Sequence, residues 1–228
     1  MVMMAGVLES GLKNVLQSLN PSSNEEGVES MLGRIESEVQ LAANPQTFEN
    51  LHTVENLHTV ENAVDQIPFV IYASPQGEVF THETAKVLSK MKRPIVFICG
   101  HYEGIDERFI ETFVHQEISI GDFILTGGEP AVLAMIDGIS RFVPGVVGDS
   151  ASVENDSFEP GEAMVSGGLK YPVYTKPPEW RGRVVPEILR SGNHGEIAKW
   201  RKLQSETRTK EKRPDLAGVR RCFGPGRH

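Results

Sequence analysis

Three glycine-bearing loops in the middle of the chain are the segments whose residue types point most directly to chemistry. They are Ser74-Pro75-Gln76-Gly77, Gly100-His101-Tyr102-Glu103-Gly104, and the stretch from Gly121-Asp122 to Gly127-Gly128-Glu129. Glycine lets the backbone approach a ligand closely, and ligands of open α/β sheets bind at the carboxyl ends of the strands. One such loop is usually only a turn, whereas three loops after successive apolar runs favour a ligand site.

Other common site signatures are absent from the sequence. No Gly-x-x-x-x-Gly-Lys-Ser/Thr occurs, and no Gly-x-Gly-x-x-Gly follows an apolar run, so neither a triphosphate-binding loop nor a nicotinamide-dependent oxidoreductase is supported. His52 and His58 lie six positions apart without a further cluster of ligands. We therefore expect no metal site.

Asp156 and Arg141 can each be interpreted either as an ordinary charged residue or as a catalytic residue. Asp156 lies in a polar, Gly-rich stretch, where an acidic residue is usually solvated, and Arg141 ends an apolar helical pattern, where the helix dipole favours a cation. A carboxylate can instead act as a general base, and a guanidinium can stabilise developing negative charge. The residues alone leave both readings open.

The net charge of −8 is unevenly distributed. Residues 1–65 carry 2 basic and 10 acidic side chains, residues 66–175 carry 7 and 15, and residues 176–228 carry 14 and 6. A basic C-terminal segment on an acidic body is a charge distribution that favours binding of a polyanion.

The two cysteines, Cys99 and Cys222, suggest free thiols rather than a disulfide framework. With no secretory signal and no membrane-length apolar run, we expect a cytoplasmic protein.

Strands and helices must alternate to position the three loops. We predict an α/β domain with a mainly parallel sheet, built from strands at 67–73 and 94–100, helices at 81–91 (capped by Thr81), 105–114 and 129–142, and extended segments at 117–121 and 122–128.

The segments before and after this α/β domain have different sequence patterns. Residues 1–43 predict an acidic helical hairpin with two apolar stripes, which we expect to cover an exposed surface of the sheet. The hexapeptide ENLHTV occurs at 49–54 and again at 55–60, which we interpret as a linker or short helix without assigned function. Asn193 and Glu196 predict the start of a basic helix, with Ile197, Trp200 and Leu203 along one side.

Six motifs then occur in a fixed order. They are GHYEGIDERFI, SIGDFILTGGEPAVLAMID, SRFVPGVVG, NDSFEPG, YPVYTKPPEWRG and ILRSGNHGEIAKWR. Together they closely resemble the bacterial tRNA (guanine-N1)-methyltransferases, which belong to the SPOUT class. The resemblance spans about residues 70–216. It implies a deep trefoil knot within the parallel sheet, a small helical C-terminal domain and, here, an atypical helical N-terminal segment.

The resemblance also implies a cofactor and its site. S-adenosyl-L-methionine would be held inside the knot, mostly by backbone groups. The matching positions are Tyr72, Ala73, Gly100, Tyr102, Glu103, Ile120, Gly121, Phe123, Leu125, Gly127 and Gly128.

The implied reaction is methyl transfer to N1 of the guanosine 3′-adjacent to the anticodon in tRNA. Asp156 matches the family's general base, and Arg141 matches its catalytic arginine. The family acts as a homodimer, and its basic C-terminal domain binds tRNA, for which we expect Lys199, Arg201, Lys202 and Arg208 to provide contacts.

The sequence departs from the family before residue 66, where the usual strand ending in Phe-Pro and the Pro-Tyr-Gly-Gly-Gly loop are replaced by the acidic segment. We therefore expect four parts: the replacing segment (1–65), the knotted cofactor domain (66–148), a flexible catalytic linker (149–170) and a shortened tRNA-binding domain (171–228). The alternative is a truncated or divergent relative that binds S-adenosylmethionine or RNA without efficient turnover.

Overall fold

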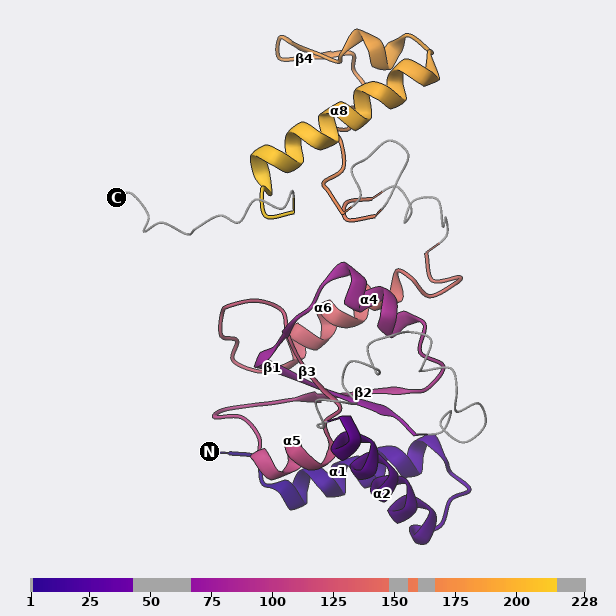
Figure 1. The fold of residues 1–228 in the computed structure, drawn as a ribbon, viewed down its shortest axis with the longest axis vertical. Coiled ribbons are helices and arrows are strands. Elements are labelled where there is room, and N and C mark those ends of the chain that lie inside the picture. Colours follow the sequence, from indigo (N-terminus) through magenta and orange to yellow (C-terminus); the bar gives the residue numbers. More distant parts are fainter. Residues whose placement is uncertain (1, 43–66, 148–155, 160–166, 217–228) are drawn as a thin grey trace, which may run out of the picture. The chain divides into compact units, whose positions relative to one another are not determined.

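The computed structural model describes residues 2–42, 67–147, 156–159 and 167–216. They belong to two compact units divided after Val146 (Figure 1). The duplicated hexapeptide with His52 and His58, and the predicted free thiol of Cys222, lie outside the described residues.

A three-stranded parallel sheet forms the centre of the first unit. Its strands are β1 (Phe69–Val79), β2 (Ile95–Cys99) and β3 (Gln116–Ser119), in the order β2-β1-β3. Tyr72 of β1 lies opposite Ile98 of β2 and Glu117 of β3. The predicted α/β class and the parallel sheet are confirmed.

The first strand is longer than predicted. β1 does not end at Ala73, because Ala73 and Glu78 both pair with Ile118 and the strand continues to Val79. The stretch 74–77, expected to be a loop after the strand, is an irregular part of it. Gly77 permits this arrangement, since a Cβ at that position would overlap the backbone of Glu117.

The segment 122–128 is also different from the prediction. This segment is not a strand. It pairs with the loop after β2 through an isolated antiparallel bridge between Gly127 and His101. The bridge therefore holds the end of this segment.

Helices α4 (His82–Ser89) and α6 (Glu129–Ser140) cover one face of the sheet (Figure 1). The Thr81 hydroxyl accepts a hydrogen bond from the Thr84 N–H (3.1 Å), which confirms Thr81 as the N-cap of α4. The buried residues between these helices and the sheet are Ile71, Ala85, Leu88, Ile118, Ala131, Met135 and Ile139.

The opposite face is covered by α1 (Ala5–Leu19), α2 (Glu25–Ala42) and α5 (Glu107–Phe113). One buried cluster joins the hairpin α1–α2 to the sheet and α5: Leu8, Leu12, Leu16, Val28, Met31, Leu32, Ile35, Val39, Ile67, Val70, Tyr72, Ile105, Phe109 and Val114. The predicted docking of the hairpin on the sheet is therefore confirmed.

The start of the hairpin is also tied to a candidate site loop. The Met3 N–H donates to the Gly104 carbonyl, and the Asp106 N–H donates to the Met3 carbonyl, both at 3.0 Å. Because Gly104 closes the loop after β2, the hairpin supports the edge of the sheet that carries this loop.

The second unit contains the hairpin of β4 (Glu179–Trp180) and β5 (Arg183–Val184), the 3₁₀ helix η3 (Glu187–Arg190) and α8 (His194–Lys212). Asn193 caps α8, as predicted, by accepting a hydrogen bond from the Glu196 N–H (3.3 Å). No helix in the described ranges is long and apolar enough to cross a membrane.

The packed side of α8 includes Ile197, as the sequence pattern predicted, but continues with polar residues, which it did not predict. Leu203 is 57% exposed, although it was expected to share a side with Ile197. The buried stripe runs instead through Ser205 and Thr209, which are 0% and 2% exposed. Ser205 Oγ donates to the Leu169 carbonyl (2.7 Å), and the Leu169 N–H donates to Thr209 Oγ1 (2.9 Å). The partner of α8 is an extended backbone, whose polar groups need hydrogen bonds when they are buried.

Candidate functional site

Tyr72 and Gly100 bring two of the predicted cofactor loops together. Tyr72 is buried in β1, and Gly100 follows β2 directly. A Cβ at Gly100 would lie 2.7 Å from Tyr72 Oη, so only glycine lets the phenol occupy this place. Burial, and then the nearby Glu117 and Glu107 carboxylates, raise the pKa of Tyr72, so its hydroxyl keeps its proton and can donate a hydrogen bond.

The loops after β2 and β3 are joined by backbone contacts. The Gly128 N–H donates to the Gly100 carbonyl (3.0 Å), and Gly127 bridges His101. A Cβ at Gly128 would lie 2.9 Å from the Cα of Cys99, so a larger residue would push the loops apart. The three predicted residues Gly100, Gly127 and Gly128 therefore meet at one edge of the sheet.

A side-chain pair that the sequence reasoning missed closes the same junction. His101 Nε2 donates to Glu129 Oε1 at 2.6 Å, and both side chains are about half exposed. A hydrogen bond from its own backbone N–H, and then the one from His101, lower the pKa of the Glu129 carboxyl. The sequence signal that could have indicated this pair is that each residue directly follows a predicted cofactor-binding glycine: His101 follows Gly100, and Glu129 follows Gly128.

Gly121 opens the third loop with φ 144°, a conformation that favours glycine. Ser119 Oγ accepts from the Gly121 N–H (3.1 Å) and donates to the Gly121 carbonyl (3.2 Å). The Phe123 N–H donates to the same carbonyl (2.9 Å). Ser119, also missed from the sequence, holds the start of this loop.

The remaining predicted cofactor residues divide into two groups. Ala73 and Ile120 are partly buried against the cluster beneath α4 and α6. The exposed group consists of Tyr102, Glu103, Phe123 and Leu125. Tyr102 is 76% exposed with φ 57°, an uncommon value for a residue other than glycine. The exposed group offers apolar and acidic side chains around the glycine junction.

This sheet edge is suited to holding a ligand close to the backbone. Its parallel strands end together, its glycines let the loops after β2 and β3 approach closely, and its rim carries aromatic and aliphatic side chains. Within the described residues, no three His, Cys, Asp or Glu side chains gather into a group that could hold a metal ion.

Arg141 and Asp156 lie in different units. Arg141 is the C-cap of α6, and its N–H donates to the Asp137 carbonyl (3.3 Å). Asp156 belongs to the second unit, where its carboxylate accepts a hydrogen bond from the Ser157 N–H at 2.9 Å. The dipole of α6 places partial negative charge near the Arg141 backbone, which favours the cation there.

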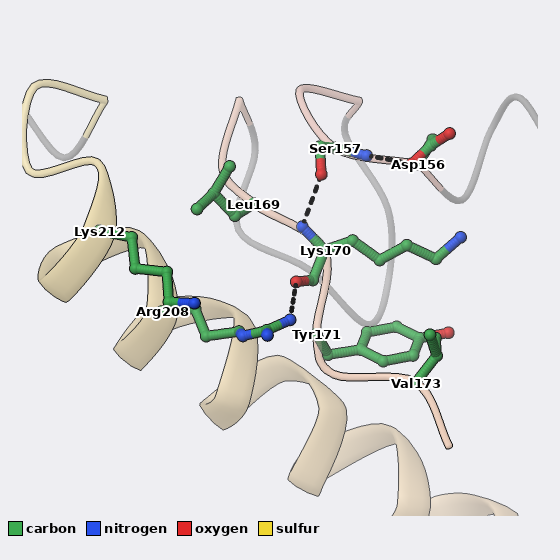
Figure 2. A pocket seen from close by; sticks show the side chains of 8 residues that line it. All are labelled: Asp156, Ser157, Leu169, Lys170, Tyr171, Val173, Arg208 and Lys212. Carbon is green, nitrogen blue, oxygen red and sulfur yellow. Dashed lines mark hydrogen bonds between the residues drawn. The ribbon is translucent and has the colours of Figure 1, made fainter. Parts of the chain in front are cut away.

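Asp156 lies at a cavity of about 360 Å³ in the second unit (Figure 2). The cavity is lined by Asp156, Ser157, Leu169, Lys170, Tyr171, Val173, Arg208 and Lys212. Ser157 Oγ accepts from the Lys170 N–H (3.0 Å), which connects the Asp156 turn to the segment along α8. One carboxylate thus lines the cavity together with three cationic side chains.

The four predicted tRNA-binding cations occupy two sides of α8. Lys199 and Lys202 are exposed. Arg201 and Arg208 are partly buried: Arg201 stacks on the Tyr171 ring at 4.8 Å, and Arg208 Nη1 donates to the Lys170 carbonyl at 3.5 Å. The two arginines therefore also hold the segment that carries Lys170 and Tyr171.

A family model described as tRNA (Guanine-1)-methyltransferase TrmD matches residues 47–219. The chain belongs to this family. The matched range contains every predicted site residue in both units, whereas the hairpin α1–α2 lies before it.

Named relatives agree with this membership. The chain is 50% identical over 153 residues to a tRNA (guanine-N(1)-)-methyltransferase of Ruminiclostridium cellulolyticum, covering 67% of this chain and 63% of the relative. Proteins of the same name from Desulforamulus reducens (52% over 151 residues, 66% and 57%) and Neisseria meningitidis serogroup C (53% over 147 residues, 64% and 56%) are similarly related. The chain thus spans less than two thirds of the length of these methyltransferases.

Proposed function

We propose that this chain transfers a methyl group from S-adenosyl-L-methionine to N1 of the guanosine 3′-adjacent to the anticodon in tRNA. The observation that carries the proposal is the junction of Tyr72, Gly100 and Gly128 at the sheet edge of a chain in this family. Relatives 50–53% identical are named for methyl transfer to guanine N1 in tRNA.

The sheet edge fits S-adenosylmethionine. The positions where a Cβ would collide leave the loops after β2 and β3 close together. The residues that would hold the molecule are those at the glycine junction, together with Ala73, Tyr102, Glu103, Ile120, Gly121, Phe123 and Leu125. When bound, S-adenosylmethionine supplies an electrophilic methyl group attached to a sulfonium.

Asp156 would act as the general base. Guanine N1 carries a proton, and its lone pair is not free to attack until that proton leaves. A carboxylate within hydrogen-bond reach can accept the proton as the N–C bond forms. The Ser157 N–H, which donates to the Asp156 carboxylate at 2.9 Å, would help to orient it.

Arg141 would stabilise the charge that this proton transfer creates. As N1 loses its proton, negative charge develops on the guanine, chiefly at its exocyclic oxygen. A guanidinium is always charged and presents a planar array of donors, which suits it to that oxygen. Because methyl transfer needs in-line placement more than covalent help, positioning of the two substrates would supply much of the rate.

The RNA would be held mainly by the second unit. Residues 176–228 carry 14 basic and 6 acidic side chains, and exposed cations release counterions when they neutralise phosphates. Lys199 and Lys202 would contact the phosphates of the RNA backbone directly. Arg201 and Arg208 would hold the protein segment beside Asp156 and contribute positive charge.

We further propose the finer architecture that goes with family membership. The loops around the glycine junction would form the trefoil knot, and the chain would act in the cytoplasm as a homodimer whose partner subunit contributes to each site. The four parts at 1–65, 66–148, 149–170 and 171–228 would serve as support, cofactor domain, catalytic linker and tRNA-binding domain.

A methyl-transfer assay tests the proposal. The purified chain should transfer labelled methyl from S-adenosylmethionine to a tRNA transcript with guanosine after the anticodon, and should not label the transcript with adenosine there. Calorimetry should show binding of the demethylated product and no binding of NAD. Cofactor binding without any methyl transfer would favour the non-catalytic alternative, whereas NAD binding would overturn the assignment of the site.

A further inference from the structure

The hairpin β4–β5 exposes the larger part of an aromatic side chain. Trp180 is 59% exposed, in a strand of two residues that packs on no described hydrophobic cluster. The other tryptophan, Trp200, has its ring 6.4 Å from Tyr174 on the second unit. Trp180 therefore contributes little to a core, and its large ring remains available to a partner.

The charge around Trp180 indicates the kind of partner. The Arg181 guanidinium lies 4.9 Å above the Trp180 ring, and Arg183 is the cross-strand partner of Trp180. Lys176 precedes the hairpin and is exposed, and Glu179 is the acidic residue of the two strands. An aromatic ring among cations fits a partner with flat rings and negative charge.

The turn of the hairpin strengthens this reading. Arg181 and Gly182 both have positive φ, 52° and 74°, as the two central residues of a type I′ hairpin turn require. Such a position favours Gly, Asn or Asp, and an arginine there is strained. The strained residue is also the one whose guanidinium covers Trp180, so the arginine is disfavoured by the turn and suited to binding.

We propose that the β4–β5 hairpin is a base-stacking surface for single-stranded RNA. Trp180 provides the platform, Arg181 and Arg183 contact neighbouring phosphates, and an unpaired base displaces or adds to the Arg181 stack. Unpaired bases stack on aromatic side chains in many RNA complexes, whereas a paired helix does not offer its base faces. The proposal rests on the proposed function, because an unpaired loop of tRNA is the single strand that this function would supply.

The chain carries its own probe for this surface. In a Trp200→Phe variant, Trp180 is the only tryptophan, so its fluorescence reports on the hairpin alone. Adding oligouridylate should quench the emission, and adding an RNA duplex of the same length should leave it nearly unchanged. Equal quenching by both RNAs, or by neither, would overturn the proposal.

Two substitutions separate stacking from charge and from folding. Trp180→Ala should weaken binding of oligouridylate by roughly 10-fold to 100-fold, the usual effect of losing one stacked base. The slope of affinity against salt should not change, because no charge is lost. Arg181→Asn should also weaken binding but should raise the melting temperature, because asparagine suits the turn. If Arg181→Asn lowered stability and binding together, the arginine would be structural and the proposal would fail.

The matched control is Val184→Ala, which changes an exposed apolar residue of the same hairpin. It should leave the affinity for oligouridylate unchanged, and an effect equal to that of Trp180→Ala would contradict stacking.

Failure of the proposed stacking surface can be distinguished from failure of the proposed function. Methyl transfer to tRNA with no change in Trp180 fluorescence would refute the surface alone, whereas specific quenching without methyl transfer would refute the function alone.

Discussion

Glu38 in α2 and His115, the residue before β3, are joined by a hydrogen bond of 3.2 Å between Glu38 Oε2 and His115 Nε2, although 77 positions separate them. The same oxygen accepts from Arg93 Nη1 at 2.7 Å. His115 Nδ1 accepts from the Val70 N–H (3.0 Å), so in the neutral ring the hydrogen is on Nε2 and points to Glu38. This polar contact anchors the hairpin α1–α2 to the sheet.

Replacing Glu38 by glutamine should destabilise the first unit. The substitution removes a charged acceptor shared by Arg93, 11% exposed, and His115, 5% exposed. Hydrogen bonds to charged groups contribute about 1.5–3 kcal/mol, so we expect a loss of this size in the free energy of unfolding by urea. Glu29→Gln is the matched control, because Glu29 pairs with Lys13 at the surface of the same hairpin. That change should cost about 0–1 kcal/mol; equal losses would mean that the buried anchor has no special role.

The same contact should make stability depend on pH. Burial raises the pKa of Glu38, but the hydrogen bonds from His115 and Arg93 outweigh it and lower the pKa to about 2 from its ordinary 4.5. Burial lowers the pKa of His115 below its ordinary 6.5. Both groups bind fewer protons in the folded state, so their stabilisation is present above their ordinary pKa values and is lost as the pH falls.

Urea midpoints measured from about pH 7 to about pH 3 should show the loss in two stages. The fall should begin below 6.5, where the unfolded state takes up a proton that the folded state binds poorly at His115. It should steepen below 4.5, where the same holds for Glu38. In Glu38→Gln the lower stage should be weaker. A wild-type curve that is flat over this range would contradict the linkage.

Gly77→Ala should disturb the sheet itself. A Cβ at this position would overlap the backbone of Glu117 and Ile118, so β1 and β3 must separate. Overpacking of this kind typically costs about 1–3 kcal/mol, and it should also weaken cofactor binding, since the loop after β3 would move. Gly11→Ala is the control. Gly11 lies in α1 with nothing within 4 Å of an added Cβ, so alanine there should stabilise the helix by about 1 kcal/mol.

Asp156→Asn should abolish methyl transfer while leaving the affinity for S-adenosylmethionine nearly unchanged. An amide keeps the shape and can still accept from the Ser157 N–H, but it cannot take the N1 proton. Loss of a general base lowers turnover by roughly 10²-fold to 10⁴-fold, measured in single turnover. Asp215→Asn, which removes an exposed partner of Arg213, should leave turnover intact. If Asp156→Asn retained most activity, the base would be another residue.

Local patterns in the sequence determined much of the α/β fold. Thr81 and Asn193 cap the helices that their spacing predicted, because a cap depends on residues two or three positions away. The apolar stripes of residues 1–43 predicted both hairpin helices, and the burial of Leu12 and Ile35 follows from that periodicity. The glycine loops and six ordered motifs were sufficient to recognise the family, since they are linear features of the chain.

Contacts between distant segments were decided by the tertiary structure. The register shift that extends β1 past Ala73 depends on the backbone of Glu117, and the polar stripe of α8 depends on the carbonyl and N–H of Leu169. The pairs His101–Glu129 and Glu38–His115 join residues 28 and 77 positions apart. Sequence periodicity reports which side of an element is buried, but not which distant polar group lies there. The sequence alone therefore determined the helices and the family, whereas the folded structure decided the extent of the strands and how the loops, the hairpin and their polar partners meet.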